Sequence, residues 1–167
     1  MIGFRALAPG DIELVHEWRL RPHVARWWGE RRTLQESEAK YLPRISGEDP
    51  VDVYLSELDG RPVGMIQTYL LEDFADYWPV GRGPGVAGVD LFIGEEELTG
   101  RGLGAQVLRA FVRDVVFADP AVTACVADPD LENRASVRAF EKAGFQLGET
   151  FARPGEDKTA QLVRIER

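Results

Sequence analysis

The sequence predicts a mixed α/β (α+β) fold in which helices flank a largely antiparallel central sheet. Short segments rich in β-branched residues recur along the chain, and segments with apolar residues at helical spacing lie between them. The dipeptide Asp59-Gly60 is a hairpin signal between two early strands. A later strand, helix and strand succession requires a crossover. The predicted order is therefore β, helices, β, β, β, α, β, α, β, β.

Composition limits the class of protein and of partner. The 167 residues are 44% apolar and 29% charged and contain no repeat or linker, so we expect a single domain over residues 1–167. A formal charge of −8 argues against a nucleic-acid partner and favours a cationic or neutral one. No apolar run approaches the roughly 18 residues of a membrane span, and the N-terminus lacks a signal-peptide pattern. We therefore expect a cytoplasmic protein with no membrane partner.

One strand and one helix are predicted first. Residues 2–7 alternate as a strand, and Asp11 is placed to be the N-cap of a helix over Ile12–Leu20. The dipeptide Arg21-Pro22 ends this helix.

Two more helices precede the second strand. Residues 23–29 (HVARWWG) form a short helix that stops at glycine. Thr33 and Glu36 have the spacing of a capping box, which starts a third helix that ends near Leu42-Pro43. Helices in this position can form a substrate wall.

Two strands and a long loop come next. Residues 51–57 and 61–71 are the strand candidates, and the second contains Gln67 among apolar residues. The loop over residues 71–85 mixes acidic and aromatic side chains, which fits either a binding loop or a solvated, turn-rich connection. The acidic members are Glu72, Asp73 and Asp76, and the aromatic ones are Phe74, Tyr77 and Trp78.

A strand with one carboxylate then leads into a glycine-rich turn and a helix. Val86–Ile93 is apolar except at Asp90, where a strand normally carries an apolar residue. Glycines at alternate positions, Gly100, Gly102 and Gly104, allow a ligand close to the backbone, and the following helix directs unpaired N–H groups towards an anion such as a phosphate. An apolar stripe anchors this helix on a sheet. Its members are Leu103, Val107, Leu108, Phe111, Val112, Val115 and Val116.

The chain closes with three strands and one helix. Residues 122–126 form a short strand, and a helix begins at Asn133 or Arg134 and ends at Ala143, with Gly144 as its C-cap. The final strand pair covers residues 145–152 and 159–165.

Two motifs resemble the GNAT superfamily of acetyl-CoA-dependent N-acetyltransferases. Residues 99–105 (TGRGLGA) are similar to its pyrophosphate loop. Residues 133–136 (NRAS) followed by 140–145 (FEKAGF) are similar to its second signature. A glycine cluster alone is weak evidence, but both signatures in this order are specific. The resemblance implies a GNAT-like fold with a splayed cofactor cleft.

Further motifs are similar to the aminoglycoside 6′-N-acetyltransferases of the Trp-Trp-Gly type. They are residues 23–29, Tyr54, Gln67, residues 84–86, residues 88–90 and Asp128-Pro129. The similarity runs from about Phe4 to Val163 and weakens in the loop near residues 71–82 and at the C-terminus. Acyltransferases of siderophore lysines share part of this pattern.

The resemblance implies a donor site for acetyl-CoA and no metal. Main-chain groups of residues 91–93 would pair with the pantetheine arm, and N–H groups of the glycine loop would bind the pyrophosphate. Asn133 would contact the arm, or only cap its helix, and Phe140 fits the core better than a cofactor contact. The candidate cofactor-binding residues are Leu91, Phe92, Ile93, Arg101, Gly102, Leu103, Gly104, Ala105, Asn133 and Phe140.

The acceptor side requires carboxylates and aromatic surfaces. An alkylamine with a pKa near ~10.4 is protonated at pH 7, so a base must remove its proton, and Asp90 is the candidate, directly or through water. Asp128 would steer the amine or a neighbouring sugar ring; the alternatives are a satisfied buried Asp90 and a capping Asp128. One residue of the Trp27-Trp28 pair is expected in the core and Trp28 in the cleft. The candidate substrate-binding residues are Trp28, Tyr54, Gln67, Asp73, Asp76, Asp90 and Asp128.

Four positions depart from the family pattern. Thr99 replaces the usual Gln or Arg, and Gly83 replaces an acidic residue before Pro-Gly, with Asp73 or Asp76 as possible substitutes. Phe140 and Gln161 stand where relatives carry a tyrosine, so no general acid is evident and the CoA thiolate can leave unassisted.

These observations predict an acetyl-CoA-dependent aminoglycoside 6′-N-acetyltransferase that transfers acetyl directly in a ternary complex, as a monomer or homodimer. Cys125, the single cysteine, fits a small buried residue in a reducing compartment better than a nucleophile. Two alternatives stay open. The chain could acylate another amine, such as a siderophore lysine or a protein terminus, or it could be a non-catalytic CoA-binding domain.

Overall fold

The computed structural model describes residues 1–29 and 33–167. The chain divides into two compact units. The first unit contains Met1–Gln67 and Leu91–Arg101, and the second contains Thr68–Asp90 and Gly102–Arg167. Within the described residues, no helix has the length and apolarity that a membrane span requires.

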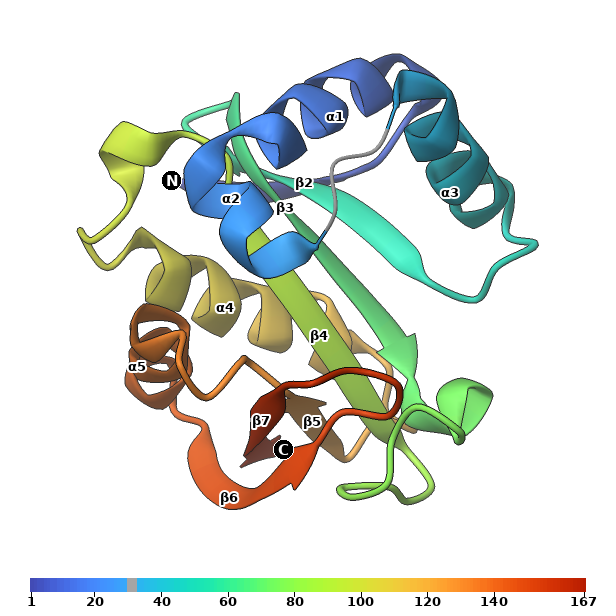
Figure 1. Cartoon of the computed structure of the whole chain (residues 1–167), viewed down its shortest axis with the longest axis vertical. Helices are drawn as coiled ribbons and strands as arrows, with labels where there is room; N and C mark the ends of the chain where they lie inside the picture. The colour runs from blue at the N-terminus through green and yellow to red at the C-terminus, as the bar shows by residue number, and fades with distance from the viewer. Residues whose placement is uncertain (30–32) are drawn as a thin grey trace. The chain divides into compact units, whose positions relative to one another are not determined.

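The first unit contains the N-terminal strands and helices (Figure 1). Its elements are β1 (Ile2–Ala6), α1 (Ile12–Leu20), α2 (Pro22–Trp28), α3 (Leu34–Ser46), β2 (Asp52–Leu58), most of β3 (Arg61–Leu70) and the end of β4 (Val86–Ile93). Helices α1 and α3 lie side by side (Figure 1). Trp18, Tyr41 and Leu55 are fully buried in this unit, so its helices and strands share an apolar core.

Local signals account for most boundaries in the first unit. The capping box starts α3 as predicted: the Glu36 N–H donates to Thr33 Oγ1 at 3.2 Å, and the Thr33 N–H donates to Glu36 Oε2 at 2.7 Å. The prediction that α3 ends near Pro43 is wrong, because the helix continues to Ser46. Proline loses only its own N–H bond, and the helix ends at Gly47, whose φ of 83° suits a left-handed cap.

Asp11 takes the predicted N-cap position of α1 without capping it. Its carboxylate accepts instead from the Ala8 N–H at 2.8 Å and from Arg5 Nη1 at 2.8 Å. The hairpin between β2 and β3 turns at Asp59 and Gly60, with φ of 51° and 78°, and so confirms the turn predicted from this dipeptide.

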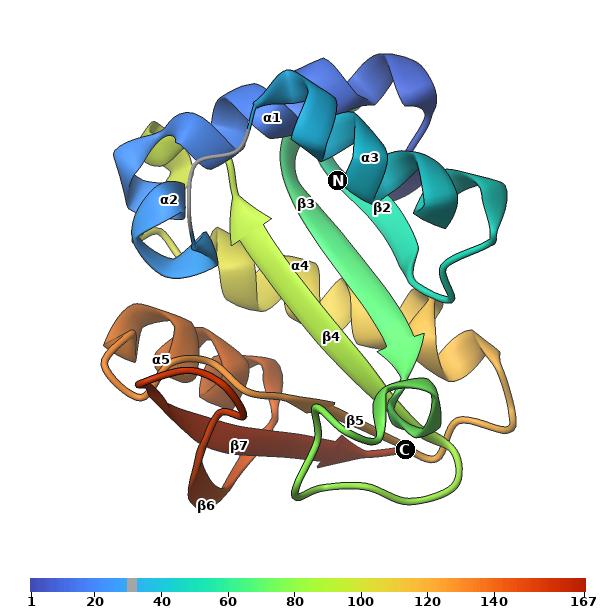
Figure 2. The same cartoon turned by 45° about the vertical axis from the view of Figure 1, so that its right-hand side comes forward.

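The second unit contains the C-terminal elements (Figure 2). They are the start of β4, α4 (Leu103–Asp114), β5 (Ala124–Ala127), α5 (Arg134–Ala143), β6 (Gln146–Ala152) and β7 (Thr159–Glu166), together with the last residues of β3. Helices α4 and α5 lie side by side in both views. The apolar stripe of α4 is buried as predicted, but the helix ends at Asp114, so Val116 lies in a separate short 3₁₀ helix.

The seven strands follow the hydrogen-bonding order β1-β2-β3-β4-β5-β7-β6. Strands β1 and β2 are antiparallel, as are β5 with β7 and β6 with β7, whereas β4 and β5 are parallel. The predicted mixed, largely antiparallel sheet flanked by helices is therefore confirmed, including the crossover, which runs through α4.

Candidate active site

Two carboxylates lie just beyond the paired residues of the parallel strands β4 and β5. The register between β4 and β5 runs from Val86↔Ala124 to Gly88↔Val126. Asp90 and Asp128 each lie two residues beyond the last of these pairs, and the charge of Asp90 contributes to the raised pKa of Asp128, so the two carboxylates are close enough to interact. Asp90 is half-buried and Asp128 is 5% exposed. The structure therefore brings together the predicted base and the predicted second carboxylate.

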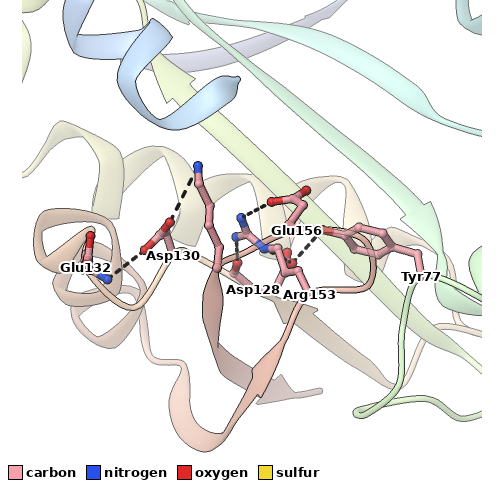
Figure 3. Close-up of polar contacts among 7 residues, drawn as sticks. Tyr77, Asp128, Asp130, Glu132, Arg153 and Glu156 are labelled. Carbon is pink, nitrogen blue, oxygen red and sulfur yellow. Dashed lines mark hydrogen bonds and ion pairs between the residues drawn. The ribbon is translucent and has the colours of Figure 1, made fainter. Parts of the chain in front are cut away.

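Asp128 is engaged by two residues from other segments (Figure 3). The hydroxyl of Tyr77 donates to Asp128 Oδ2 at 2.8 Å, and Arg153 Nε donates to the same oxygen at 3.0 Å. Arg153 Nη2 also donates to the Asp128 carbonyl. Asp128 is thus a buried carboxylate paired with an internal cation.

Burial and mutual charge determine the ionisation of this group. Burial raises the pKa of Asp128 to about 6, with a further contribution from the charge of Asp90 and a partial offset from Arg153. Burial and the Asp128 charge likewise raise the pKa of Tyr77. Cys125 is fully buried, as predicted, and burial followed by the charge of Asp90 raises the pKa of its thiol well above the ordinary value. This thiol is poorly suited to act as a nucleophile.

The loop over residues 71–85 has a buried anchor. Trp78 is fully buried in an apolar cluster of the second unit and packs on Phe151 at a centroid distance of 6.2 Å. Tyr77 packs against the same cluster before its hydroxyl reaches Asp128. Asp73 and Asp76 are exposed. The loop is therefore not simply a solvated connection, and its carboxylates face solvent.

The start of α4 has the form expected of an anion site. Gly102 is its N-cap residue with φ of 82°, and no side chain caps the helix. A side chain at Gly104 would meet only the Ala139 methyl at 3.8 Å, so the space over the first turn is open. Leu103 and Ala105 point into the core instead, since both side chains are buried. The residues present therefore fit a phosphate bound by backbone N–H groups. Arg101 is exposed.

Asn133, Phe140 and Gln161 all have structural partners. Asn133 is the N-cap of α5, and its Oδ1 accepts from the Ser136 N–H at 3.2 Å. Phe140 is buried and contacts Phe145 edge-on at a centroid distance of 5.0 Å, which confirms the core assignment. Gln161 is buried and donates to the carbonyls of Gly148 and Leu162 at 2.8 and 2.9 Å. Gln161 is thus an internal amide that links β6 and β7.

In the first unit, the end of β4 packs against two tryptophans. The ring of Phe92 lies 5.0 Å from that of Trp28 and 6.3 Å from that of Trp18, in edge-on geometry. The Ile93 carbonyl accepts a hydrogen bond from His23 Nε2 at 3.0 Å. Leu91 and Ile93 are half-buried. Of the predicted main-chain cofactor contacts, the Ile93 carbonyl therefore already has an internal donor.

The expectation that one tryptophan of the pair lies in the core is wrong. Trp27 and Trp28 are both half-buried. Trp27 has the Arg26 guanidinium 4.8 Å from its ring centroid, and the Trp28 carbonyl accepts from Arg19 Nη2 at 2.7 Å. Each tryptophan ring borders a cation, Arg26 at Trp27 and Arg19 at Trp28.

The remaining predicted acceptor contacts of the first unit are Tyr54 and Gln67. Gln67 is 7% exposed, and its Oε1 accepts from Arg44 Nη1 at 2.9 Å. Arg44 is fixed in turn by Asp49, at 2.9 Å. Tyr54 is half-buried, and burial raises the pKa of its hydroxyl.

Sequence reasoning missed Arg153 and Arg44, and treated Tyr77 only as one aromatic residue of a loop. Arg153 and Arg44 pair with residues 25 and 23 positions away, so no local motif marks them. The one available signal for Arg153 is a cation directly before the Pro154-Gly155 turn of the last hairpin.

Comparisons with known proteins agree with this geometry. The family model described as an acetyltransferase (GNAT) domain matches residues 8–153. Aminoglycoside N(6′)-acetyltransferase type 1 of Klebsiella pneumoniae is 34% identical over 157 residues, covering 92% of this chain and 78% of that protein. A lysine N-acyltransferase of Mycolicibacterium paratuberculosis is 29% identical over 150 residues, covering 84% of this chain and 63% of that protein.

A solved structure extends the similarity to the whole chain. The crystal structure of the aminoglycoside acetyltransferase AAC(6′)-Ib in complex with coenzyme A and kanamycin is 32% identical, with a TM-score of 0.91, and the match covers 100% of this chain and 95% of that one. The chain therefore belongs to the GNAT family of acetyltransferases and groups within it with the aminoglycoside N(6′)-acetyltransferases.

Proposed function

We propose that this chain transfers an acetyl group from acetyl-CoA to the 6′-amine of aminoglycosides, directly and in a ternary complex. The observation that carries the proposal is the pair of carboxylates just beyond the paired residues of β4 and β5, in a chain 34% identical to an aminoglycoside N(6′)-acetyltransferase. A polycationic acceptor needs such negative charge. The proposal includes a single acetyltransferase domain over residues 1–167, acting in the cytoplasm.

The donor side of the proposal rests on backbone groups. N–H groups of residues 102–105 bind the pyrophosphate at the uncapped start of α4, and Arg101 adds positive charge. Main-chain groups of residues 91–93 pair with the pantetheine arm, and one of their N–H groups polarises the thioester carbonyl. When bound, acetyl-CoA supplies the activated acetyl group.

On the acceptor side, Asp90 binds the 6′-ammonium and removes its proton, directly or through one water. A carboxylate is a weak base for an ammonium of pKa ~10.4. If the second carboxylate stabilised the ammonium strongly, removal of the proton by Asp90 would become harder still. Trp28, Tyr54 and Gln67 contribute contacts to the sugar rings. The buried thiol of Cys125 fits transfer without a covalent enzyme intermediate.

A thiol-release assay tests the proposal with two sets of aminoglycosides, one with an amine and one with a hydroxyl at the 6′ position. We expect CoA release only with the 6′-amines. Release with 6′-hydroxyl compounds would contradict the regiochemistry.

Acylation of another amine is the second candidate, favoured by the 29% identity to a lysine N-acyltransferase. Release of CoA with lysine or a peptide amine, and none with kanamycin, would establish that activity instead. CoA binding without turnover on any amine would indicate a non-catalytic CoA-binding domain.

A further inference from the structure

The turn that follows β6 fixes the position of Arg153. The Arg153 N–H donates to the Lys158 carbonyl at 3.1 Å, and the Arg153 carbonyl accepts from the Glu156 N–H at 3.2 Å. The residue therefore sits at the start of the turn between β6 and β7, where two turn residues restrain its backbone. Its side chain is only 13% exposed, so it is not a freely moving surface cation.

All three guanidinium nitrogens have partners (Figure 3). Nε donates to Asp128 Oδ2 at 3.0 Å, Nη2 donates to the Asp128 carbonyl, and Nη1 lies 3.6 Å from Glu156 Oε2. A planar guanidinium engaged at three edges keeps one orientation. Arg153 is therefore a fixed internal cation that binds both the side chain and the main chain of Asp128.

The pairing offsets part of the charge of Asp128, because the same guanidinium also lies 3.6 Å from Glu156 Oε2. The side chain of Asp128 is only 6% exposed, which weakens screening by solvent and makes the neighbouring cation effective. Tyr77 and Arg153 Nε both use Oδ2, so neither of these bonds occupies Oδ1. What Asp128 offers a ligand is an acceptor oxygen whose negative charge is partly offset by Arg153.

We propose that Arg153 determines acceptor specificity by offsetting the charge of Asp128, so that Asp128 accepts from a hydroxyl group of the acceptor rather than from a second ammonium. The inference rests on the proposed acetyl transfer to aminoglycosides. It assigns different preferences to the two carboxylates, with Asp90 binding the reacting amine and Asp128 binding a neutral donor.

Removal of the cation tests this assignment. The assay measures thiol release with two aminoglycosides that both carry a 6′-amine. They differ at one other position of the same ring, where one has a hydroxyl and the other an amine. Loss of the cation raises the pKa of Asp128 further, so the assay is run at about pH 8.5 to keep this carboxyl ionised. We expect Arg153→Gln to lower KM for the acceptor with the extra amine about tenfold relative to its partner, since one charged hydrogen bond contributes roughly that factor. Arg153→Lys keeps the charge and is expected to retain the wild-type ratio of the two KM values.

A matched control removes the same charge from the same hairpin. Lys158 lies 4.0 Å from Asp130 and is 42% exposed, so Lys158→Gln should leave the ratio of KM values unchanged. The double variant Asp128→Asn with Arg153→Gln removes both partners and leaves no unpaired buried charge. We expect it to retain the wild-type ratio, because its site again lacks an unpaired carboxylate.

Several outcomes would overturn the inference. They are an equal change of KM for both acceptors in Arg153→Gln, Arg153→Lys behaving like Arg153→Gln, or a shifted ratio in the double variant. If Arg153→Gln does not fold, as judged by its Tm and its CoA binding, the comparison of Arg153→Lys with the double variant decides. Failure of the proposed function is distinct, since the wild type would then release no CoA with either acceptor.

Discussion

The first turn of α4 and the end of β5, both in the second unit, are built on different principles. At α4 the groups available to a ligand are backbone N–H donors after Gly102, with no capping side chain. At β5 the ligand-binding group is the Asp128 side chain, whose charge depends on Tyr77 and Arg153 from two other segments. A backbone site depends on local conformation, whereas a side-chain site can change its charge through a single distant substitution. The binding groups of the donor half, at the start of α4, therefore depend on local conformation. Those of the acceptor half, at Asp128, depend on several segments of the chain.

The largest expected effect tests the acceptor half. Asp90→Asn removes the proposed base but keeps the size of the side chain, so we expect turnover to fall about 10²- to 10⁴-fold. Binding of CoA, measured by calorimetry, should stay unchanged because the start of α4 is not altered. Asp114→Asn, at the exposed end of α4, is the matched control and should keep full turnover.

If Asp90→Asn keeps wild-type turnover, Asp90 has no part in proton transfer. If Asp90→Asn loses CoA affinity as much as turnover, the donor and acceptor halves do not act independently.

The second prediction concerns pH and tests whether Arg153 offsets the burial of Asp128. The pKa of Asp128 in the folded protein is about 6, above the unfolded value, so the folded state binds its proton more tightly. The contribution to stability is complete below about pH 4 and is lost as the pH rises through about 6. We expect wild type to lose about 3 kcal/mol relative to Asp128→Asn over this interval, measured by urea unfolding. Parallel pH curves would place the pKa of Asp128 near its ordinary value.

The same contrast explains how much could be predicted from the sequence. Residues 99–105 and the α5 signature carry their information in consecutive residues, so glycine spacing and helix caps predicted α4 and α5 closely. The strand containing Asp90 was also predicted with its observed bounds, because β-branched residues fill it.

Residues whose partners lie far away in the sequence could not be predicted. Arg153 follows the last residue of β6, and only the antiparallel pairing of β6 with β7 and β7 with β5 brings it to Asp128. Gln67 was predicted from its strand context, but its partner Arg44 comes from the end of α3, beyond the proline at which that helix was expected to stop. Tertiary pairing determines the charge of these groups, and local patterns do not encode it.

The third prediction tests the backbone character of the donor half. A methyl at Gly104 makes only ordinary contact with Ala139, so Gly104→Ala fits the fold and should stabilise the first turn by about 0.5 kcal/mol. A phosphate bound by the N–H groups of this turn would be crowded by the same methyl, and we expect KM for acetyl-CoA to rise about tenfold. Thermal unfolding and steady-state kinetics separate the two effects. A raised Tm with unchanged KM would show that no phosphate binds there.

The smallest expected effect separates capping from ligand binding at Asn133. Its Oδ1 caps α5 through the Ser136 N–H, so Asn133→Ala should cost about 1 kcal/mol and lower Tm by about 3 °C. Asn133→Ser keeps a capping oxygen and should keep the wild-type Tm. Both variants lose the amide NH₂ proposed to contact the pantetheine arm, and we expect KM for acetyl-CoA to rise about threefold in each. If KM rises only in Asn133→Ala, the residue acts through the helix cap alone, and the donor half depends on backbone groups here as well.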